Sequence, residues 1–279
     1  MKIALFPKVH EEESKKLAQE TLDFLTSKNI EVVVEDDKAE ALSAPPLSSC
    51  DSNEIDILIT MGGDGSILRV AHKYSHLDAA ILGINLGHLG FMADVKIKDI
   101  IPGLENLIQN RYSIQERVMI EGESSTNKSF FAINDCVLHR ARNPSLVEIS
   151  IHVDNLFLNT FEADGVIIST PNGSTAYSLA AGGPIVSPNI EAFIITPICP
   201  HTISNRPIVI NPNQDIRIEY KGYKQPIEFV TDGFEHFEMK VGDQVFLRKS
   251  PKKFKLVNLD GIDYFSTLRT KLNWSGKLR

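Results

Sequence analysis

The chain has 279 residues, 42% of them hydrophobic, and a net charge of −7, so it can bury a full core but lacks the clustered positive charge that nucleic-acid binding requires. Its three cysteines lie far apart and form no CxxC pair, which argues against a disulfide framework and against a zinc site built on cysteine. The N-terminal apolar run is too short for a signal peptide and no run is long enough to cross a membrane, so we expect a soluble, cytoplasmic protein without a membrane partner.

The first 110 residues alternate between short apolar runs and helical patterns. Helical spacing is expected over residues 10–29 and again over 67–74. Strands are expected at KIALF (2–6), EVVVE (31–35), IDILIT (55–60) and AAILGIN (79–85). This alternation predicts an α/β domain with a parallel, Rossmann-like sheet over residues 1–110. The acidic segment 35–53, rich in Pro and Ser, is expected to be a mobile loop.

From residue 111 the pattern changes to short runs separated by turns, which predict a β-rich domain over residues 111–258. The runs are RVMIEGE (117–123), SFFAINDCVLH (129–139), LVEISIHVD (146–154), LFLNTFEA (156–163), GVIIST (165–170), EAFIIT (191–196), RPIVI (206–210), DIRIEY (215–220), IEFVTD (227–232) and QVFLR (244–248). The last segment, 259–279, is amphipathic, and we expect a helix that packs on the first domain. Its apolar stripe consists of Ile262, Phe265, Leu268 and Leu272.

The stretch MGGDGS directly follows an expected strand and opens the second helix. In open α/β sheets, ligands bind beyond the carboxyl ends of the strands. The glycines Gly62, Gly63 and Gly65 would let the backbone approach a ligand, and their amides with the helix N-terminus would form an anion cradle. A plain turn with an aspartate cap is the alternative explanation.

Asp64 is unexpected in an anion site, because a carboxylate repels phosphate. It could hold a divalent metal such as Mg²⁺ that bridges to phosphate oxygens, or it could accept the proton of an attacking hydroxyl. Arg69, one turn into the helix, could supply a cation to phosphate or be a solvated surface arginine.

Two further glycine-containing stretches are candidates for ligand contact. In NLGHLGF, His88 could carry a proton, although an exposed loop histidine is the simpler interpretation. In STAYSLAAGG, the hydroxyls of Thr175, Tyr177 and Ser178 stand among small residues such as Ala176, which suits a flat ligand lying against backbone. A short helix packed closely on a sheet explains that composition equally well.

Asn134 and Asp135 interrupt an otherwise apolar run. Buried polar side chains are costly unless they are paired. A ribose diol would be a suitable partner, and a β-bulge with internal hydrogen bonds would serve equally. Two hydrolase classes find no support, because no HExxH spacing occurs and Ser174 does not lie in a GxSxG elbow.

Taken in order, the motifs GGDGS, NLGHLGF, IND, DGVIISTPNGSTAYSLAAGGPIV and TPICPHTISNRPIV resemble the NAD kinase family, whose members use ATP, or in some cases polyphosphate, to make NADP. The resemblance extends from about Ile55 to Val209. Diacylglycerol and sphingosine kinases share GGDG, but they lack the STPNGSTAYSLAAGGP string.

The resemblance implies an N-terminal α/β domain, a C-terminal β-rich domain, a site between them and a homodimer or homotetramer. Asp64 matches the family's aspartate that acts as a base toward the adenosine 2′-hydroxyl or as a Mg²⁺ ligand. The other residues implied to bind ATP or NAD are Gly62, Gly63, Gly65 and Arg69 in the turn and helix, Asn134 and Asp135 at the adenosine end of NAD, Asp164 at its nicotinamide half, and Thr175, Ala176, Tyr177 and Ser178 in the adenine pocket.

Three positions depart from the family pattern. Glu162 stands where Arg or Lys often precedes the DG pair, Asn172 replaces the second threonine of TPTGST, and Phe234 replaces the glutamine of DGQ. Glu162 places negative charge near a dianionic dinucleotide. It would therefore weaken the binding of NAD rather than affect phosphoryl transfer. A non-catalytic dinucleotide sensor and a lipid or sugar kinase that shares the glycine turn are therefore kept as alternatives.

Overall fold

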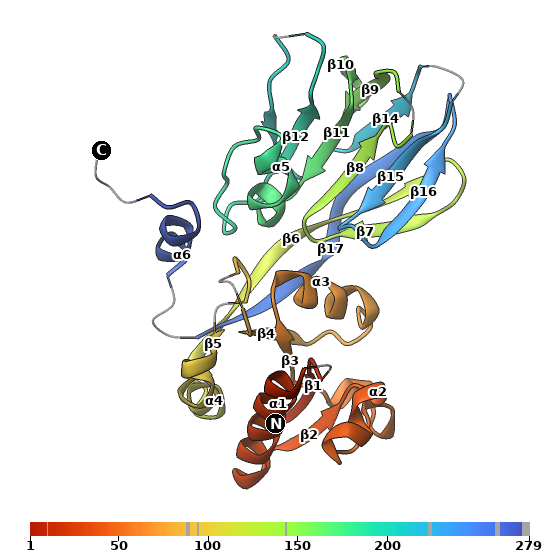
Figure 1. Ribbon diagram of the computed structural model, residues 1–279. Helices are drawn as coiled ribbons and strands as arrows, with labels where there is room; N and C mark the ends of the chain where they lie inside the picture. Colours follow the sequence, from red (N-terminus) through yellow and green to blue (C-terminus); the bar gives the residue numbers. More distant parts are fainter. Residues whose placement is uncertain are drawn as a thin grey trace. The chain divides into compact units, whose positions relative to one another are not determined.

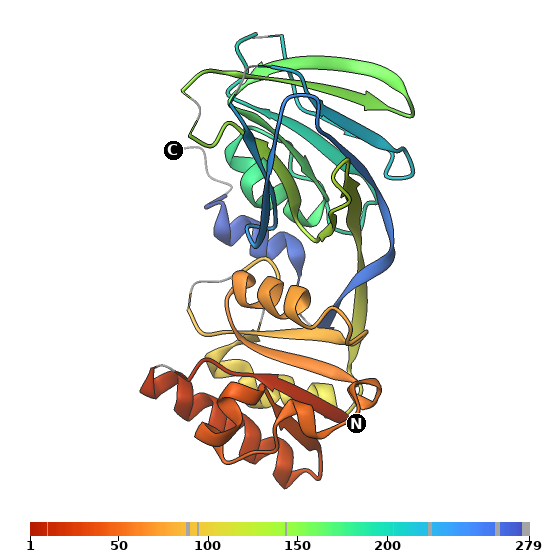
Figure 2. The same ribbon diagram turned by 90° about the vertical axis from the view of Figure 1, so that its right-hand side faces the viewer.

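The computed structural model forms two compact units, whose elements are labelled in Figure 1 and seen from a second side in Figure 2. It describes residues 1–9, 11–87, 90–93, 95–142, 144–202, 204–222, 225–259 and 263–274. Unit 1 contains Met1–Gln115 and Lys255–Arg279, and unit 2 contains Glu116–Phe254.

The chain passes from one unit to the other along two continuous strands, β6 (Tyr112–Ser124) and β17 (Gln244–Leu259). Neither crossing has the Gly- or Pro-rich composition of a linker. The boundaries expected from the sequence, 110/111 and 258/259, therefore rest on the change of pattern alone and stay predictions.

Unit 1 is built on a parallel sheet whose strands lie in the order β2-β1-β3-β4. Its elements are β1 (Lys2–Phe6), α1 (Glu12–Ser27), β2 (Glu31–Val34), α2 (Asp36–Ala39), β3 (Ile57–Gly62), α3 (Asp64–Lys73), β4 (Ala80–Asn85), β5 (Val95–Lys96), α4 (Ile100–Ile108) and α6 (Tyr264–Lys271). The end of β17 joins this sheet parallel to β4, with Leu256 beside Ile81.

Helices cover both faces of the unit 1 sheet. Figure 2 shows α3 (orange) on one side of the strands and α1 (red) and α4 (yellow) on the other. Leu25 of α1 and Leu104 of α4 share a core cluster with Ile59 of β3. On the opposite face α3 comes so close that a Cβ on Gly83 would lie 2.5 Å from Ile67 Cδ1. The predicted parallel α/β domain is confirmed, and burial on both faces explains its continuous apolar strands.

The expectation of a mobile loop over residues 35–53 is wrong. The segment contains α2 and three short 3₁₀ turns, at residues 40–42, 47–49 and 52–54. Leu42 and Leu47 are buried, and the Glu35 side chain is only 1% exposed. Single leucines in a polar segment create no period, so only their tertiary contacts reveal that this segment is part of the core.

Unit 2 consists of antiparallel strands in two sheets. One has the order β13-β12-β11-β8-β15-β16, and in the other β10, β9, β14 and the start of β17 lie side by side. The elements are β7 (Ser129–Ala132), β8 (Asp135–His139), β9 (Val147–Val153), β10 (Leu156–Ala163), β11 (Gly165–Ser169), α5 (Tyr177–Ala180), β12 (Phe193–Ile198), β13 (Ile208–Ile210), β14 (Ile216–Tyr220), β15 (Ile227–Thr231) and β16 (Glu235–Met239). The predicted β-rich domain is confirmed, although the charged strand β16 was not expected.

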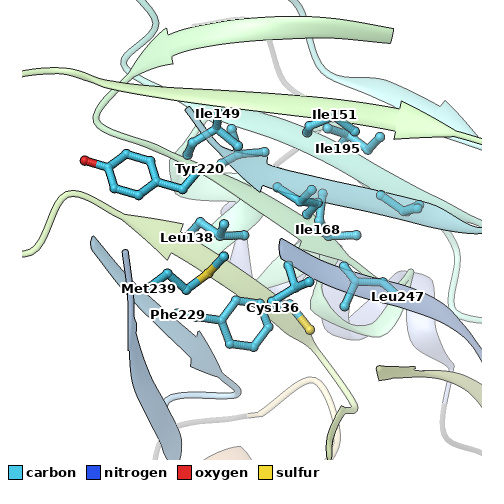
Figure 3. Close-up of a cluster of buried hydrophobic side chains, with 14 of the residues drawn as sticks. Cys136, Leu138, Ile149, Ile151, Ile168, Ile195, Tyr220, Phe229, Met239 and Leu247 are labelled. Atoms are coloured by element: carbon cyan, nitrogen blue, oxygen red, sulfur yellow. The ribbon is translucent and has the colours of Figure 1, made fainter. Parts of the chain in front are cut away.

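The two sheets of unit 2 enclose one hydrophobic core, part of which is drawn in Figure 3. Leu138 and Ile168 come from one sheet, and Ile149 and Ile151 come from the other. Ile167 is buried on the opposite face of β11. Because β11 is covered on both faces, its sequence is a continuous apolar run rather than an alternating one.

The C-terminal helix α6 belongs to unit 1. Leu268 is buried, but Phe265 is 58% exposed, so the expected apolar stripe is only partly covered. Ile262, the first residue of that stripe, lies outside the described residues. The ammonium group of Lys271 lies 4.4 Å from the ring centroid of Phe91. None of the described helices is both long and apolar enough to cross a membrane.

Candidate functional site

The glycine-rich turn lies where β3 ends and α3 begins. Since β2 lies on one side of β1 and β3 on the other, the direction of winding reverses between β1 and β3. Ligands of open α/β sheets bind at such a switch point. A Cβ on Gly62 would lie 2.2 Å from Ser66 Oγ, so the first glycine of the turn is required by contacts within the chain.

Asp64 is the first residue of α3, and its carboxylate accepts three backbone hydrogen bonds. The N–H of Phe91 donates to Oδ2 at 2.7 Å, and those of Met92 and Ala93 donate to Oδ1 at 3.0 Å each. A carboxylate has about four acceptor positions. The hydrogen bonds among the described residues therefore leave one position, on Oδ2, and they tie the start of α3 to the segment after the second glycine motif.

The last glycine of NLGHLGF makes room for this carboxylate. A Cβ on Gly90 would lie 2.0 Å from Asp64 Oδ1. At the start of the same loop, Asn85 Oδ1 accepts the N–H of Gly87 at 2.8 Å. His88, the expected proton carrier, lies outside the described residues. Contacts within unit 1 thus explain why Asn85 and Gly90 of this motif are asparagine and glycine.

Gly63 and Gly65 have no such internal reason to be glycine. Both are exposed, and a Cβ on either would meet no atom within 4 Å. Gly65 lies in the first turn of α3, where alanine would favour the helix. Glycine at these two positions agrees with the prediction that a ligand approaches the backbone here.

Arg69 forms an ion pair instead of standing alone in solvent. Its Nη1 lies 3.2 Å from Oε1 of the buried Glu35, and the same oxygen accepts bonds from Lys73 Nζ at 2.9 Å and Tyr74 Oη at 3.2 Å. Burial raises the pKa of Glu35, but the Lys73 hydrogen bond and the Arg69 charge outweigh it and hold that pKa below its ordinary value. The cluster fixes α3 to the end of β2, while 44% of the Arg69 side chain stays exposed.

Two lysines that sequence reasoning missed add positive charge at the ends of β4 and β5. Lys96 and Lys98 line a hollow of about 440 Å³ together with Asn85, Gly87 and Ile97. The pairing of β5 with β4 places Lys96 beside Asn85. The two lysines belong to no motif, so only the strand pairing brings them to the edge where the glycine motifs lie.

In unit 2 a second aspartate repeats the arrangement of Asp64. The carboxylate of Asp232 accepts the N–H groups of Ile133 at 2.7 Å, Asn134 at 2.7 Å and Asp135 at 3.0 Å. Asp232 and Gly233 have φ values of 49° and 76° and form the tight turn between β15 and β16, as Asp-Gly commonly does in hairpins.

The apolar run 129–139, expected to be one strand, is two strands. It breaks between β7 and β8 at residues 133 and 134, and Asp232 accepts the N–H groups at the break. The adjacent polar residues that looked costly inside a strand therefore mark its interruption. The Asp-Gly pair was a usable signal for a turn, but its long-range partner could not be found without the fold.

Asp135 begins β8 and is only 6% exposed. Burial and then the nearby charge of Asp232 raise the pKa of Asp135 to about 7. Near neutral pH this carboxyl can therefore donate a hydrogen bond in one form and only accept in the other. Perturbed groups of this kind are frequent at functional sites.

The side chain of Asn134 belongs to a chain of hydrogen bonds. Asn172 Nδ2 donates to Asn134 Oδ1 at 2.6 Å, and Arg117 Nη1 donates to Asn172 Oδ1. Arg117 and Asn172 are 6% and 8% exposed. Asn172, which departs from the family pattern, thus contacts a residue expected to bind NAD.

The hydroxyl-rich segment forms a 3₁₀ turn followed by α5. Ser178 is fully buried and shares a hydrogen bond of 2.9 Å with Thr196, so its hydroxyl holds the segment to β12. Tyr177 is 46% exposed, and Thr175 and Ala176 are partly exposed. The short helix packed on a sheet accounts for Ser178, while the three residues before it are accessible to a ligand.

Asp164, expected at the nicotinamide half of NAD, lies between β10 and β11. Its Oδ1 is 2.8 Å from Arg140 Nε. Glu162 is 54% exposed and lies 3.8 Å from His201 Nδ1. Unit 2 therefore supplies a cation beside Asp164 that the motif itself does not contain.

No group of three or more His, Cys, Asp or Glu residues within the described ranges could hold a metal ion. Asp64 offers one acceptor position, on Oδ2. Mg²⁺ at nucleotide sites commonly takes one or two carboxylates and completes its shell with phosphate oxygens and water. The donor set thus fits a cation carried by a nucleotide.

Two family models match this chain. The ATP-NAD kinase N-terminal domain matches residues 3–112, and the ATP-NAD kinase C-terminal domain matches residues 133–259. The NAD kinase of Protochlamydia amoebophila is 50% identical over 99% of this chain and 99% of its own. The NAD kinase of Geotalea daltonii is 36% identical over 98% of each chain.

Two solved structures are similar to this chain. Yeast NADH kinase complexed with NADH has a TM-score of 0.88 and 26% identity, covering 100% of this chain and 89% of its own. An NAD kinase from Archaeoglobus fulgidus in complex with ATP has a TM-score of 0.77 and 24% identity, covering 98% of this chain and 99% of its own. The second similarity concerns the fold alone.

Proposed function

This chain belongs to the NAD kinase family, and on that premise we propose that it transfers the γ-phosphoryl group of ATP to the 2′-hydroxyl of the adenosine ribose of NAD, giving NADP. The observation that carries the proposal is the match of both family domains in a chain 50% identical to an NAD kinase over 99% of its length. A solved relative complexed with NADH supports a dinucleotide ligand here.

In this proposal Asp64 orients the 2′-hydroxyl and accepts its proton. The hydroxyl would occupy the acceptor position on Oδ2 that the three backbone bonds leave. Those bonds fix the direction of the carboxylate before substrate arrives, which favours reaction by positioning. A single remaining position also means that Asp64 can serve the hydroxyl or a metal, but not both together.

Phosphate groups would be met by backbone amides at the start of α3 and by nearby cations. Gly63 and Gly65 leave the backbone open to approach, and Gly62 supports the turn. Arg69, oriented by Glu35, keeps an exposed guanidinium for phosphate. A divalent metal such as Mg²⁺, when bound to ATP, would neutralise charge on the phosphate oxygens during transfer.

For NAD we propose contacts from unit 2. Asn134 and Asp135 would hold the ribose hydroxyls, since they offer a donor and a carboxyl side by side at the start of β8. Asp164 would contact the nicotinamide half. The adenine pocket would be lined by Thr175, Ala176 and Tyr177, with Ser178 anchoring the segment.

The full chain should form NADP when it is incubated with ATP, Mg²⁺ and NAD, as measured with an NADP-specific dehydrogenase. A folded protein that binds NAD but forms no NADP would be the dinucleotide sensor. Phosphorylation of diacylglycerol with none of NAD would favour the lipid kinase. Replacing ATP by polyphosphate and NAD by NADH in the same assay defines the donor and acceptor range.

We also propose a cytoplasmic location and a homodimer or homotetramer, both on the family resemblance. Leu156 and Phe157, in the edge strand β10, are 75% and 61% exposed, which is the kind of apolar edge that a second copy would cover. Sedimentation equilibrium should give a multiple of the chain mass, and a Phe157→Glu variant should lower it.

A further inference from the structure

We propose that Asn172, supported by Arg117, is a positioning residue that fixes the side-chain amide of Asn134 with its NH₂ group toward NAD. The inference rests on the proposed function, in which Asn134 binds NAD, and it adds how the orientation of that side chain is set. Three side chains of unit 2, joined in one chain of hydrogen bonds, carry it.

Arg117 sets the direction in which hydrogen bonds are donated along these three side chains. A guanidinium only donates hydrogen bonds, whereas an asparagine amide has one accepting end and one donating end. Arg117 Nη1 donates to Asn172, so Asn172 must turn Oδ1 toward it. The Nδ2 of Asn172 then faces Asn134 and donates to its Oδ1 at 2.6 Å. The usual ambiguity of amide orientation is removed by a donor-only neighbour.

Asn134 is thereby left with its Nδ2 hydrogens for a ligand. Within the described part of the chain, no hydrogen bond from this Nδ2 is present, and the side chain is half-buried. The backbone is held separately, because Asp232 accepts the Asn134 N–H at 2.7 Å and the Asn134 carbonyl accepts the Thr170 N–H at 2.8 Å. Backbone and side chain are both fixed before any ligand binds.

A fixed donor selects an acceptor on the ligand. The oxygen of a ribose hydroxyl can accept from Asn134, and its own hydrogen is then available to the neighbouring Asp135 carboxylate. Asn172 stands where the family usually has threonine, whose hydroxyl both donates and accepts. A threonine could accept from Arg117 and donate its hydroxyl hydrogen to Asn134, but it could also accept from the Asn134 amide, so asparagine makes the orientation stricter at this position.

Asn172→Asp tests the orientation directly. The aspartate keeps the bond from Arg117 but cannot donate to Asn134, whose amide should then flip and present its oxygen to NAD. We expect the Kd for NAD, measured by calorimetry without ATP, and the KM for NAD to rise about 10- to 100-fold, because the flipped amide no longer donates to the ribose oxygen and the single hydroxyl hydrogen cannot serve both Asn134 and Asp135. The KM for ATP and the melting temperature should stay near those of the wild type.

Asn134→Asp supplies the complementary result. This variant still accepts from Asn172 but has lost the donor to NAD, so it should fold normally and lose NAD affinity by a similar factor. If the amide oxygen of Asn134 faced NAD instead, the substitution would keep that acceptor and NAD affinity would persist. Unchanged NAD affinity in either folded variant overturns the inference.

Matched variants separate this effect from others. Asn213→Asp makes the same change at an exposed position of unit 2 and should leave NAD binding unchanged. Should Asn172→Asp not fold, Asn172→Thr and Asn172→Val decide: threonine should keep NAD affinity within a few-fold and valine should lose it, and equal affinities contradict the proposal. A wild type that makes no NADP contradicts the proposed function, whereas an active wild type with an unaffected Asn172→Asp contradicts the inference alone.

Discussion

Asp64 and Asp232 have the same local arrangement in two different units. Each carboxylate accepts the N–H groups of three consecutive residues, 91–93 in one case and 133–135 in the other. One held segment begins at the last residue of NLGHLGF, and the other contains Asn134 and Asp135, which the family resemblance implies to bind NAD. Only Asp64 is proposed to touch a reacting atom, which makes Asp232 its natural control.

Asp64→Asn should lower kcat by roughly 10²–10⁴, since general-base assistance is lost, while the KM for NAD changes little. Asn can accept at one end only, so the variant should also lose about 1–3 kcal/mol of stability. Asp232→Asn should lose a similar amount of stability but keep kcat within a few-fold. Steady-state kinetics and chemical denaturation measure both quantities. Equal kcat values for the two variants would assign Asp64 a purely structural role.

The raised pKa of Asp135 predicts a pH dependence of stability. Burial and the charge of Asp232 raise this pKa to about 7, above an unfolded value of about 3.9. The folded chain therefore retains a proton that the unfolded chain releases, and this contribution to stability is lost as pH rises from about 4 to about 7. Asp135→Asn should be more stable than the wild type at pH 8, by up to about 4 kcal/mol, and should approach it near pH 4. The prediction would be contradicted if the difference in unfolding free energy between Asp135→Asn and the wild type stayed constant from pH 4 to pH 8.

At the scale of elements, α3 connects the glycine turn to the rest of unit 1. Gly65 lies in the first turn of α3, where a Cβ would meet no atom, and Gly90 lies against the Asp64 carboxylate, so the two positions separate space open to a ligand from space that the chain itself fills. Gly65→Ala should raise the melting temperature and increase the free energy of unfolding by up to about 1 kcal/mol. The reason is that Gly65 lies in a helix and the added Cβ would meet no atom. The KM of this variant for ATP or NAD should rise about tenfold or more if a ligand fills that space. Unchanged KM values in this variant would show that no ligand lies against Gly65.

Gly90→Ala should behave in the opposite way, since its Cβ would lie 2.0 Å from Asp64 Oδ1. We expect it to lose about 1–3 kcal/mol of stability and to lower kcat, because the carboxylate is displaced.

The cluster at the other end of α3 allows a test of Arg69. Arg69 and Lys73 both bond Glu35, so removing either should cost less than about 1 kcal/mol while the other remains. Arg69→Gln should in addition raise the KM for ATP about tenfold if its exposed guanidinium binds phosphate. Lys73→Gln is the matched control and should leave this KM unchanged. Equal KM values would make Arg69 only an anchor of the helix.

At the scale of the whole molecule, the net charge of −7 must be reconciled with two anionic substrates. In the proposed reaction the cation arrives bound to ATP. EDTA should abolish NADP formation, and excess Mg²⁺ should restore it. The melting temperature without nucleotide should not change with EDTA, whereas a fall of several degrees would indicate a resident metal that contributes to stability.

The fold class, the family and most candidate residues could be predicted from the amino-acid sequence. Parallel and antiparallel strands differ in apolar pattern because one kind is covered on both faces and the other mostly on one, so the two domains could be predicted from local periodicity. Motifs such as GGDG and NGSTAYS are contiguous, and their spacing is visible without coordinates.

The residues that hold these candidates in place could not be predicted without the folded chain. Asp232 lies 98 positions from Asn134, and Arg117 lies 55 from Asn172. Hydrogen bonds of this kind depend on which strands become neighbours, and strand pairing leaves no local pattern in the chain. Contacts between distant residues also explain why the buried Glu35 in a polar segment and the break between β7 and β8 were not foreseen.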